Sequence, residues 1–400
     1  MSLAVMLAPL RYVQGPDALL QLGEQLQILG LKNPLILTSP SARKAVGPTL
    51  SQGLESRGIA YAFMDFGGEC TRREIERIKN TCIEGGHDAI INCGGGKTLD
   101  AGRAAAAKSA LNVEVNPPEF IPDLGAGVAC INIPTVAATD ASTSAVSLVY
   151  CETHTVEATM VYPTSPTMVF VDTSVIAKSP VRLLVAGMGD ALATYFEAAI
   201  TYQTGSRAVV TQSYSTRATQ ALARLCFDLL MEYGVQGKIE AEAGVPGPGL
   251  EAVVEANILL SGLGFESGGI SASHAVGHGF HHIPDFFEVP QYHGELVAFG
   301  TLVQLLLERR TPAYLDTVFG FCTSVGLPTT FAEMTLKDLT DEALETVALA
   351  ASRDMIIRSM PGSFPTPDEQ GRHYDHREIL HAIIATDAYG RAFSRRKSAP

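Results

Sequence analysis

The chain has 400 residues, enough for two domains with large cores, and its 46% hydrophobic and 18% charged residues are typical of globular proteins. Its formal net charge of −13 argues against a nucleic-acid-binding protein, because such proteins need a basic face to displace counterions. The charge does not exclude small anionic ligands, since backbone amides bind phosphate without net positive charge.

Cysteine usage and apolar segments predict the compartment. The seven cysteines are widely spaced and form no CxxC motif, which argues against a disulfide framework or a cysteine zinc site and favours a reducing cytoplasm. Met1–Leu10 is apolar but short and has no basic leader, so we expect no signal peptide. No uncharged apolar run reaches the roughly 18–20 residues that cross a bilayer, so we expect no membrane partner.

The first part of the chain alternates strand and helix patterns. Apolar runs suited to strands lie at Tyr12–Val13, Pro34–Thr38, Asp88–Cys93, Val128–Pro134 and Val169–Asp172. Asp17 is placed to cap a helix that runs to Gly30, and Lys97–Ala110 consists of strong helix formers. Alternation at this spacing predicts an α/β domain with a parallel, doubly wound sheet and helices on both faces.

Near Lys178 the strand patterns nearly vanish and helical periodicity takes over. Helices are expected at Leu183–Tyr202, Ala208–Tyr233, Leu250–Phe265, His274–His282 and Glu295–Leu307. We therefore predict an α/β domain at residues 1–178 and an all-helical domain at residues 179–400. The apolar stretch Thr301–Leu307 suits either the core of the second domain or a contact with another subunit.

A glycine run, Gly94–Gly96, follows the strand Asp88–Cys93. Glycines let the backbone approach a phosphate closely, and the N-terminus of the following helix adds N–H donors and a favourable dipole. The run is neither a GxGxxG fingerprint nor a P-loop, and taken alone it is equally well explained as a tight turn. Its position after a strand of an α/β unit favours phosphate binding.

Short polar residues follow the strand Val128–Pro134. They are Thr135, Thr139, Asp140, Ser142, Thr143 and Ser144. Their hydroxyls suit a ribose or a pyrophosphate, and the carboxylate suits a substrate hydroxyl. The start of a capped helix is an equally good interpretation of this segment alone.

Histidines concentrate in the helical part of the chain. Five of the ten lie within twenty residues, at His274, His278, His281, His282 and His293. His274 and His278 are one helical turn apart and face the same way, and imidazole suits zinc and iron. A lone histidine is usually a satisfied polar residue, whereas this density favours a metal site. Asp190, at an expected helix start, is either a third ligand or an N-terminal cap.

Together these segments resemble the glycerol dehydrogenases of the iron-containing alcohol dehydrogenase superfamily. The motifs that carry the resemblance are Gly94–Asp100 (GGGKTLD), Pro134–Asp140 followed by Ala141, Gly189–Thr194 (GDALAT) with Glu197–Ala198, Leu250–Asn257 (LEAVVEAN), Leu259–Gly269 (LLSGLGFESGG), His274-Ala275, His293–Glu295, Val325–Thr330 (VGLPTT) and Tyr389–Arg391. The likeness covers most of the chain. It implies the dehydroquinate synthase-like fold, with an amino-terminal nucleotide-binding domain, a helical metal- and substrate-binding domain, and the site in the cleft between them.

The resemblance implies a metal site formed by Asp190, His274 and His293. Iron-type members carry a fourth ligand, a histidine one turn after the aspartate, and Thr194 stands at that position here. Three protein ligands plus substrate favour Zn²⁺. The resemblance further implies that Asp140 contacts the substrate near the nicotinamide and that Phe265 walls the substrate pocket.

The same resemblance implies the residues that bind NAD. Gly95, Gly96, Lys97 and Thr98 would cradle the pyrophosphate, and the rest of the cofactor site would be lined by Thr135, Thr139, Ser144, Val146 and Tyr150. Ser39 stands where family members usually carry an acidic residue for the adenosine ribose, with Arg43 and Lys44 nearby. Serine does not repel a 2′-phosphate, so we expect weaker discrimination against NADP than in the family.

The implied reaction is NAD-dependent oxidation of glycerol or a related small vicinal diol to the hydroxyketone, by hydride transfer from a metal-bound alkoxide. Asp140 and His278 are the expected catalytic side chains. The spacing of His278 from His274 motivates the hypothesis that His278 lies beside the nicotinamide or relays the proton. Because the family is usually oligomeric, we expect a homo-oligomer. The segment Val113–Gly127, longer than the family pattern, could reach the edge of the site or an oligomer contact.

Other functions stay open on sequence alone. A carbon–oxygen lyase of dehydroquinate synthase type shares the architecture, but its phosphorylated substrate calls for Lys and Arg, which are sparse around Asp190 and His274. A dehydrogenase acting on glycerol 1-phosphate is disfavoured for the same reason. A non-catalytic protein that kept the fold would bind the metal without turnover.

Overall fold

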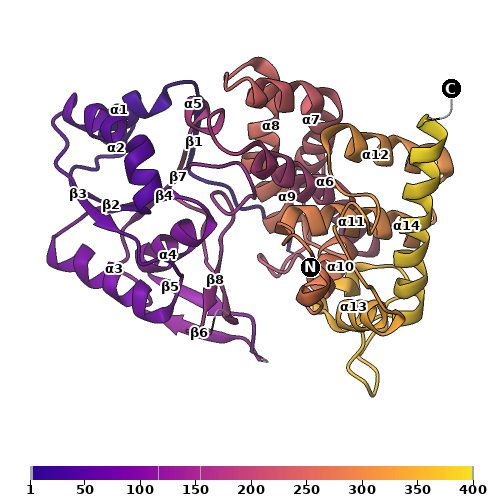
Figure 1. Ribbon diagram of the computed structural model, residues 1–400. Helices are drawn as coiled ribbons and strands as arrows, with labels where there is room; N and C mark the ends of the chain where they lie inside the picture. The colour runs from indigo at the N-terminus through magenta and orange to yellow at the C-terminus, as the bar shows by residue number, and fades with distance from the viewer. Residues whose placement is uncertain (1–2, 116, 154, 399–400) are drawn as a thin grey trace. The chain divides into compact units, whose positions relative to one another are not determined.

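The computed structural model describes residues 3–115, 117–153 and 155–398, and these form two compact units (Figure 1). The α/β unit comprises Leu7–Pro180 together with Ile239–Gly262. The helical unit comprises Val181–Lys238, Leu263–Pro400 and Met1–Met6, as far as these stretches are described. The units therefore differ from a single division at residue 178, because the segment Ile239–Gly262 packs with the α/β unit.

Six parallel strands form the main sheet of the α/β unit, in the order β1-β10-β7-β4-β2-β3. The strands are β1 (Arg11–Gly15), β2 (Pro34–Thr38), β3 (Ala62–Asp65), β4 (Ala89–Gly94), β7 (Ala129–Pro134) and β10 (Met168–Asp172). Strands β2, β4 and β10 are buried at every residue, as expected where helices cover both faces of a sheet. The predicted parallel sheet is confirmed.

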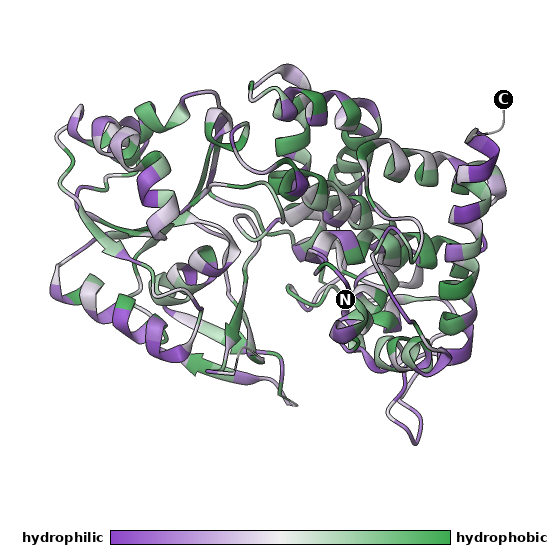
Figure 2. Ribbon diagram, in the orientation of Figure 1, coloured by the Kyte–Doolittle hydropathy of each residue, from purple (hydrophilic) through white to green (hydrophobic). Residues whose placement is uncertain are grey.

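Helices cover both faces of this sheet. They are α1 (Leu22–Ile28), α2 (Pro40–Glu55), α3 (Arg72–Glu84), α4 (Gly96–Ala106) and the short α5 (Thr173–Ile176), with a 3-10 turn at Ala18–Gln21. Figure 1 shows α1 and α2 on one side of the sheet and α3 and α4 on the other. Figure 2 shows hydrophobic residues along the strands and mixed polar and hydrophobic residues along α3. Leu22 and Leu50 pack with Ile36 and Ile91 in the core beneath α1 and α2.

The expected cap at Asp17 is wrong. Asp17 has a positive φ of 54°, and its side chain makes no capping bond within the described residues. The carboxylate of Asp172, at the end of β10, accepts from the N–H of Leu19 at 3.0 Å instead. A side chain distant in sequence thus satisfies the first turn of this helix.

A second, antiparallel sheet was not predicted from the sequence. Its strands, in the order β6-β5-β9-β8, are β5 (Ser109–Asn112), β6 (Glu119–Pro122), β8 (Val146–Tyr150) and β9 (Val156–Val161). The expected helix Lys97–Ala110 is wrong in its last turn, because α4 ends at Ala106. There the N–H groups of Ala126 and Val128 donate to the carbonyls of Ala105 and Ala106, at 2.7 and 3.0 Å. The described part of Val113–Gly127 supplies β6 and this contact.

Helices make up the rest of the chain. They are α6 (Val181–Thr204), α7 (Arg217–Glu242), α8 (Pro248–Val254), a π-helical turn (Glu255–Leu260), α9 (Ser261–Gly268), α10 (Ala272–Phe280), α11 (His293–Leu307), α12 (Pro312–Val325), α13 (Asp341–Arg353) and α14 (His376–Ser398), with 3-10 turns at Pro284–Phe286 and Met355–Ser359. Among the described helices, α6 alone is long and apolar enough to cross a membrane, and 83% of its apolar window is buried inside the protein, as in a core helix.

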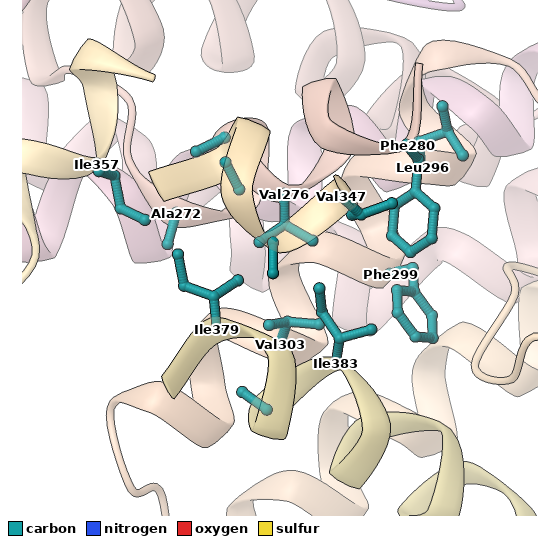
Figure 3. Close-up of a cluster of buried hydrophobic side chains, with 14 of the residues drawn as sticks. Ala272, Val276, Phe280, Leu296, Phe299, Val303, Val347, Ile357, Ile379 and Ile383 are labelled. Atoms are coloured by element: carbon teal, nitrogen blue, oxygen red, sulfur yellow. The ribbon is translucent and has the colours of Figure 1, made fainter. Parts of the chain in front are cut away.

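The core of the helical unit lies around α10 and α11 (Figure 3). Val276 and Phe280 of α10 and Phe299 of α11 pack with Val347 of α13 and Ile383 of α14. Of the two roles expected for the stretch from 301 to 307, the structure shows burial in the unit's own core for residues 301 to 305.

Candidate metal centre and dinucleotide-binding segments

Three of the expected cofactor segments meet at one edge of the main sheet. Strands β2, β4 and β7 are parallel neighbours, so the residues that follow them lie at the same edge. These residues include Ser39, Gly95 and Thr135. The N–H of Thr135 donates to the carbonyl of Gly94 at 3.1 Å. This bond joins the segment that follows β7 directly to the end of β4. This edge, at the carboxyl ends of the strands, is where α/β sheets bind nucleotides.

The glycine run forms an open turn at the N-terminus of α4. Gly95 is the N-cap residue, and a Cβ on it would meet nothing within 4 Å in the described structure. A Cβ on Gly94 would lie 2.8 Å from Oγ1 of Thr98, so the Thr98 side chain is buried beneath the turn. Lys97 is exposed, with Nζ 2.6 Å from Oε2 of Glu69. The open face of this turn, at the N-terminus of a helix, suits a pyrophosphate.

A buried arginine ties α4 to the segment after β7. Arg103 donates to the backbone carbonyls of Ala141 and Val146, and its Nη1 lies 3.1 Å from Oδ1 of Asp100. A fixed cation beneath this segment holds the backbone that carries Asp140, Ser144 and Val146. Sequence reasoning did not identify Arg103. It is a charged residue within a run of strong helix formers, and nothing in that pattern indicated that it would be buried.

The other expected residues of the 135–150 segment lie close to this contact. Oγ1 of Thr139 accepts from the N–H of Ala141 at 3.3 Å, and the N–H of Ser144 donates to the carbonyl of Asp140 at 3.1 Å. Asp140 itself is half-buried. Tyr150, at the end of β8, has its ring centroid 5.6 Å from Nζ of Lys97.

The segment Ile239–Gly262 supports the same backbone from another side. The side-chain amide of Asn257 donates to the carbonyl of Ala137 at 3.0 Å. A Cβ on Gly262 would lie 2.7 Å from Cβ of Thr143, so only glycine permits this approach. The motif Leu250–Asn257 therefore has a structural role that its sequence alone did not indicate.

Ser39, which directly follows β2, is the N-cap residue of α2. Its hydroxyl accepts from the N–H of Ala42 at 3.3 Å. Asp65, which ends the neighbouring strand β3, lies 3.2 Å from Nη1 of Arg43, and the Arg43 guanidinium lies 4.3 Å from the Phe63 ring centroid. The guanidinium of Arg43, four residues after Ser39, is therefore held by the Asp65 carboxylate and the Phe63 ring.

Three side chains of the helical unit converge on one point. Oδ1 of Asp190, from α6, lies 3.4 Å from Nε2 of His274 in α10 and 3.6 Å from Nε2 of His293 in α11. One ligand atom of each residue lies within 4.8 Å of the others. Ligand distances of about 2.0–2.1 Å around tetrahedral zinc place two ligand atoms about 3.3 Å apart. The separations to Asp190 fit that geometry.

The protonation of this cluster also suits a cation. Asp190 is buried, and its Oδ1 makes no hydrogen bond with any described residue, which is costly for a carboxylate oxygen unless a cation balances it. Burial raises the pKa of Asp190, but His274 and His293 outweigh it, so the pKa lies below its ordinary value. Burial lowers the pKa of His293 to about 3, which leaves a neutral imidazole ready to ligate.

Glycines bring the three helices close enough for these side chains to meet. A Cβ on Gly189 would lie 2.3 Å from the carbonyl oxygen of Gly294, so α6 and α11 contact each other through their backbones. Each of these glycines is adjacent in sequence to a member of the cluster, Asp190 or His293. On α10, a Cβ on Gly277 would lie 3.2 Å from Val297 of α11. Small residues at these crossings set the spacing of the site.

Known proteins resemble this chain over nearly its whole length. The glycerol dehydrogenase of Citrobacter freundii is 40% identical over 385 residues, which cover 96% of this chain and 97% of that protein. The chain belongs to the iron-containing alcohol dehydrogenase family. The sequence pattern of iron-containing alcohol dehydrogenases matches residues 9–173.

Further relatives agree with this membership of the iron-containing alcohol dehydrogenases. The glycolaldehyde reductase of Halobacterium salinarum is 34% identical, with 94% of this chain and 100% of that protein covered. The crystal structure of glycerol dehydrogenase from Schizosaccharomyces pombe matches with a TM-score of 0.85 at 29% identity, covering 100% of this chain and 94% of that one. The lyase and non-catalytic alternatives are not favoured by these relatives.

Within this iron-containing alcohol dehydrogenase, Thr194 lies one turn after Asp190 and is buried. A Cβ on Gly264 would lie 2.2 Å from the Thr194 methyl group, so α6 and α9 are packed tightly there. Among the described residues, Asp190, His274 and His293 are thus the group that could hold a metal, and position 194 adds no imidazole to it.

Two carboxylates to which the sequence analysis assigned no role lie behind the histidines. Oε2 of Glu197 lies 2.6 Å from Nδ1 of His274, and Oδ2 of Asp354 lies 2.8 Å from Nδ1 of His278. The His278 ring centroid lies 5.9 Å from that of His293, so His278 borders the cluster without joining it. Burial raises the pKa of Asp354, but the hydrogen bond from His278 outweighs it and lowers the pKa. Phe265 is half-buried on α9.

Proposed function

We propose that this protein oxidises glycerol or a related small vicinal diol to the hydroxyketone, with NAD as the hydride acceptor. One observation carries the proposal: Asp190, His274 and His293 converge on one point in a chain 40% identical, over nearly its whole length, to a glycerol dehydrogenase. The same family membership supports use of a nicotinamide dinucleotide and a divalent metal.

The three converging side chains would hold the metal, for which we propose Zn²⁺. The ion supplies a Lewis acid that lowers the pKa of a substrate hydroxyl. Asp190 contributes a single negative charge and the two imidazoles none, so the site keeps a net positive charge that favours a deprotonated alcohol. Three ligands leave a coordination position for substrate, and a vicinal diol offers two oxygens to such a site.

The α/β unit would bind NAD, which accepts the hydride. The open turn at Gly95 and Gly96, with Lys97 and Thr98, would hold the pyrophosphate. The remaining contacts would come from Ser39, Thr135, Thr139, Ser144, Val146 and Tyr150. We further propose that Asp140 contacts the substrate hydroxyl, that Phe265 walls its pocket, and that NADP is accepted as well as NAD.

His278 would hold a proton during the reaction. Its Nδ1 lies 2.8 Å from Oδ2 of Asp354, and because a carboxylate only accepts, this nitrogen carries the hydrogen. Nε2 is then the nitrogen that can accept a proton from the substrate side. We also propose a cytoplasmic homo-oligomer. Each of the seven cysteines lies in the described part of the chain and is a free thiol, which supports a reducing compartment.

Reduction of NAD with glycerol, propane-1,2-diol and a simple monoalcohol tests the proposal, before chelation, after it, and after zinc is restored. We expect activity that selects diols, is lost with chelator and returns with zinc. Reduction of glycolaldehyde with NADH is a further comparison, because one relative is a glycolaldehyde reductase. Activity that survives rigorous removal of metal would refute the metal-dependent mechanism, and inactivity with every diol would refute the substrate class.

A further inference from the structure

We propose that Glu197 is a positioning residue of the metal centre, which fixes the proton of His274 on Nδ1 and so presents Nε2 to the metal. The assignment rests on the proposed function in one respect, that a metal binds Asp190, His274 and His293. Glu197 is fully buried, and no role follows for it from the reaction itself.

The first argument is that a single helix contacts both nitrogens of the His274 ring. Oε2 of Glu197 lies 2.6 Å from Nδ1, and Oδ1 of Asp190 lies 3.4 Å from Nε2. Both carboxylates come from α6 and are seven residues apart, so two helical turns place them on the same face. The ring therefore lies between a hydrogen-bond acceptor and a metal ligand of the same helix.

The second argument is that the other oxygen of Glu197 fixes the backbone of the same histidine. Oε1 accepts from the N–H of Ser271 at 2.8 Å and from the N–H of His274 at 3.0 Å. Ser271 is the N-cap of α10, yet its own side chain makes no capping bond within the described residues. Glu197 thus takes the place of the cap, and its negative charge stabilises the positive end of the helix.

The third argument is chemical. An ionised carboxylate has no hydrogen to donate, so Nδ1 of His274 must carry one. In a neutral imidazole Nε2 is then the nitrogen with a free lone pair, which is the form that binds a metal. Carboxylates that accept from the second nitrogen of a metal-binding histidine fix its tautomer and raise its basicity, and their loss lowers metal affinity by about 10–100-fold.

Glu197→Gln tests the assignment because it changes one atom. The amide oxygen can keep the bonds to Ser271 and His274 backbone, but the amide nitrogen would face Nδ1 as a donor. His274 would then favour the tautomer with hydrogen on Nε2, which cannot bind metal. We expect zinc affinity, measured by competition with a chelator of known affinity, to fall by about 10–100-fold.

Gln304→Met is the matched control. Oε1 of Gln304 accepts from the N–H of Ser273 at 2.9 Å, so this change also removes a buried polar contact to the first turn of α10. It leaves Nδ1 of His274 untouched, and we expect zinc affinity like that of the wild type. Equal losses in both variants would overturn the assignment, since they would mean that only helix packing matters.

A further test uses the wild-type protein, so it does not depend on whether a variant folds. In the zinc-loaded protein labelled with ¹⁵N-histidine, we expect His274 to carry its proton on Nδ1. A proton on Nε2, or wild-type zinc affinity in Glu197→Gln, would overturn the role of Glu197 alone. Failure of the wild-type protein to bind zinc would overturn the metal centre of the proposed function and this assignment with it.

Discussion

A Cβ atom on Gly294 of α11 would lie 1.9 Å from the carbonyl oxygen of Ala186 in α6, so these two residues meet backbone to backbone. Gly294→Ala would force the helices apart next to both Asp190 and His293. We expect a loss of about 1–3 kcal/mol in the free energy of unfolding and weaker zinc binding. Thermal unfolding and chelator competition measure the two effects.

Gly320→Ala in α12 is the control for this prediction. A Cβ there would meet the Phe393 ring at 3.6 Å, an ordinary contact. Alanine is favoured over glycine inside a helix by about 0.5–1 kcal/mol, so we expect equal or greater stability with unchanged zinc affinity. Wild-type zinc affinity in Gly294→Ala would show that this crossing does not set the geometry of the site.

Metal binding should release a proton near neutral pH. Burial disfavours the charged form of His274, but Glu197 and Asp190 outweigh it and raise its pKa well above the ordinary value. Below that raised pKa the metal-free site holds a proton on His274 that zinc must displace, so affinity should rise with pH and then level off. His293, with a pKa of about 3, adds no proton in this range.

Titration calorimetry in two buffers of different ionisation enthalpy measures this release. We expect about one proton per zinc at about pH 6–7. Zinc binding without proton release in that range would contradict the protonated state of His274 and, with it, the influence of the two carboxylates.

His278→Ala should lower kcat if His278 relays a proton. General acid–base groups contribute about 10²–10⁴-fold, so a loss in this range is expected, together with a changed pH profile. Asp354→Ala removes the acceptor that holds Nδ1 and should lower kcat less. His282→Ala, at an exposed position of the same segment, is the control. Wild-type turnover and an unchanged pH profile in His278→Ala would count against the relay.

Cofactor preference should depend on Ser39. A serine at the end of β2 does not repel a 2′-phosphate, and Arg43 lies within the same turn of chain. We expect NADP to be used at a measurable fraction of the kcat/KM for NAD. Ser39→Asp should reduce the use of NADP by about tenfold or more while NAD is retained. A wild-type preference for NAD by several orders of magnitude would refute the prediction.

The edge of the sheet that we propose to bind the dinucleotide could be predicted from sequence, because its residues follow strands directly. Glycines and hydroxyls after apolar runs, as at Gly95 and Thr135, meet wherever neighbouring strands are parallel. The second sheet escaped prediction because its strands β5 and β6 are only four residues each and carry no clear alternation. The end of α4 at Ala106 depends on N–H groups some twenty residues later, which no local pattern reveals.

The proposed metal site was likewise predictable only in part. The density of histidines predicts His274 and His293, and periodicity places His274 and His278 on one face. Their supporting carboxylates lie 77 and 76 residues away in sequence, and buried Glu197 looks like any polar residue of a helix. Such partners are specified by the packing of helices that are distant in the sequence, which no local pattern reveals.

Because the segment Ile239–Gly262 belongs to the α/β unit, this unit is completed only after part of the helical unit has been synthesised. Every strand of the main sheet has been made once Asp172 emerges, but Glu251, which accepts from the Gln14 amide of β1 at 2.7 Å, comes much later. At about 5–20 residues per second, the ninety residues up to Gly262 take roughly 5–20 s. During that interval β1 and the 135–144 backbone lack the contacts that Glu251, Asn257 and Gly262 later provide.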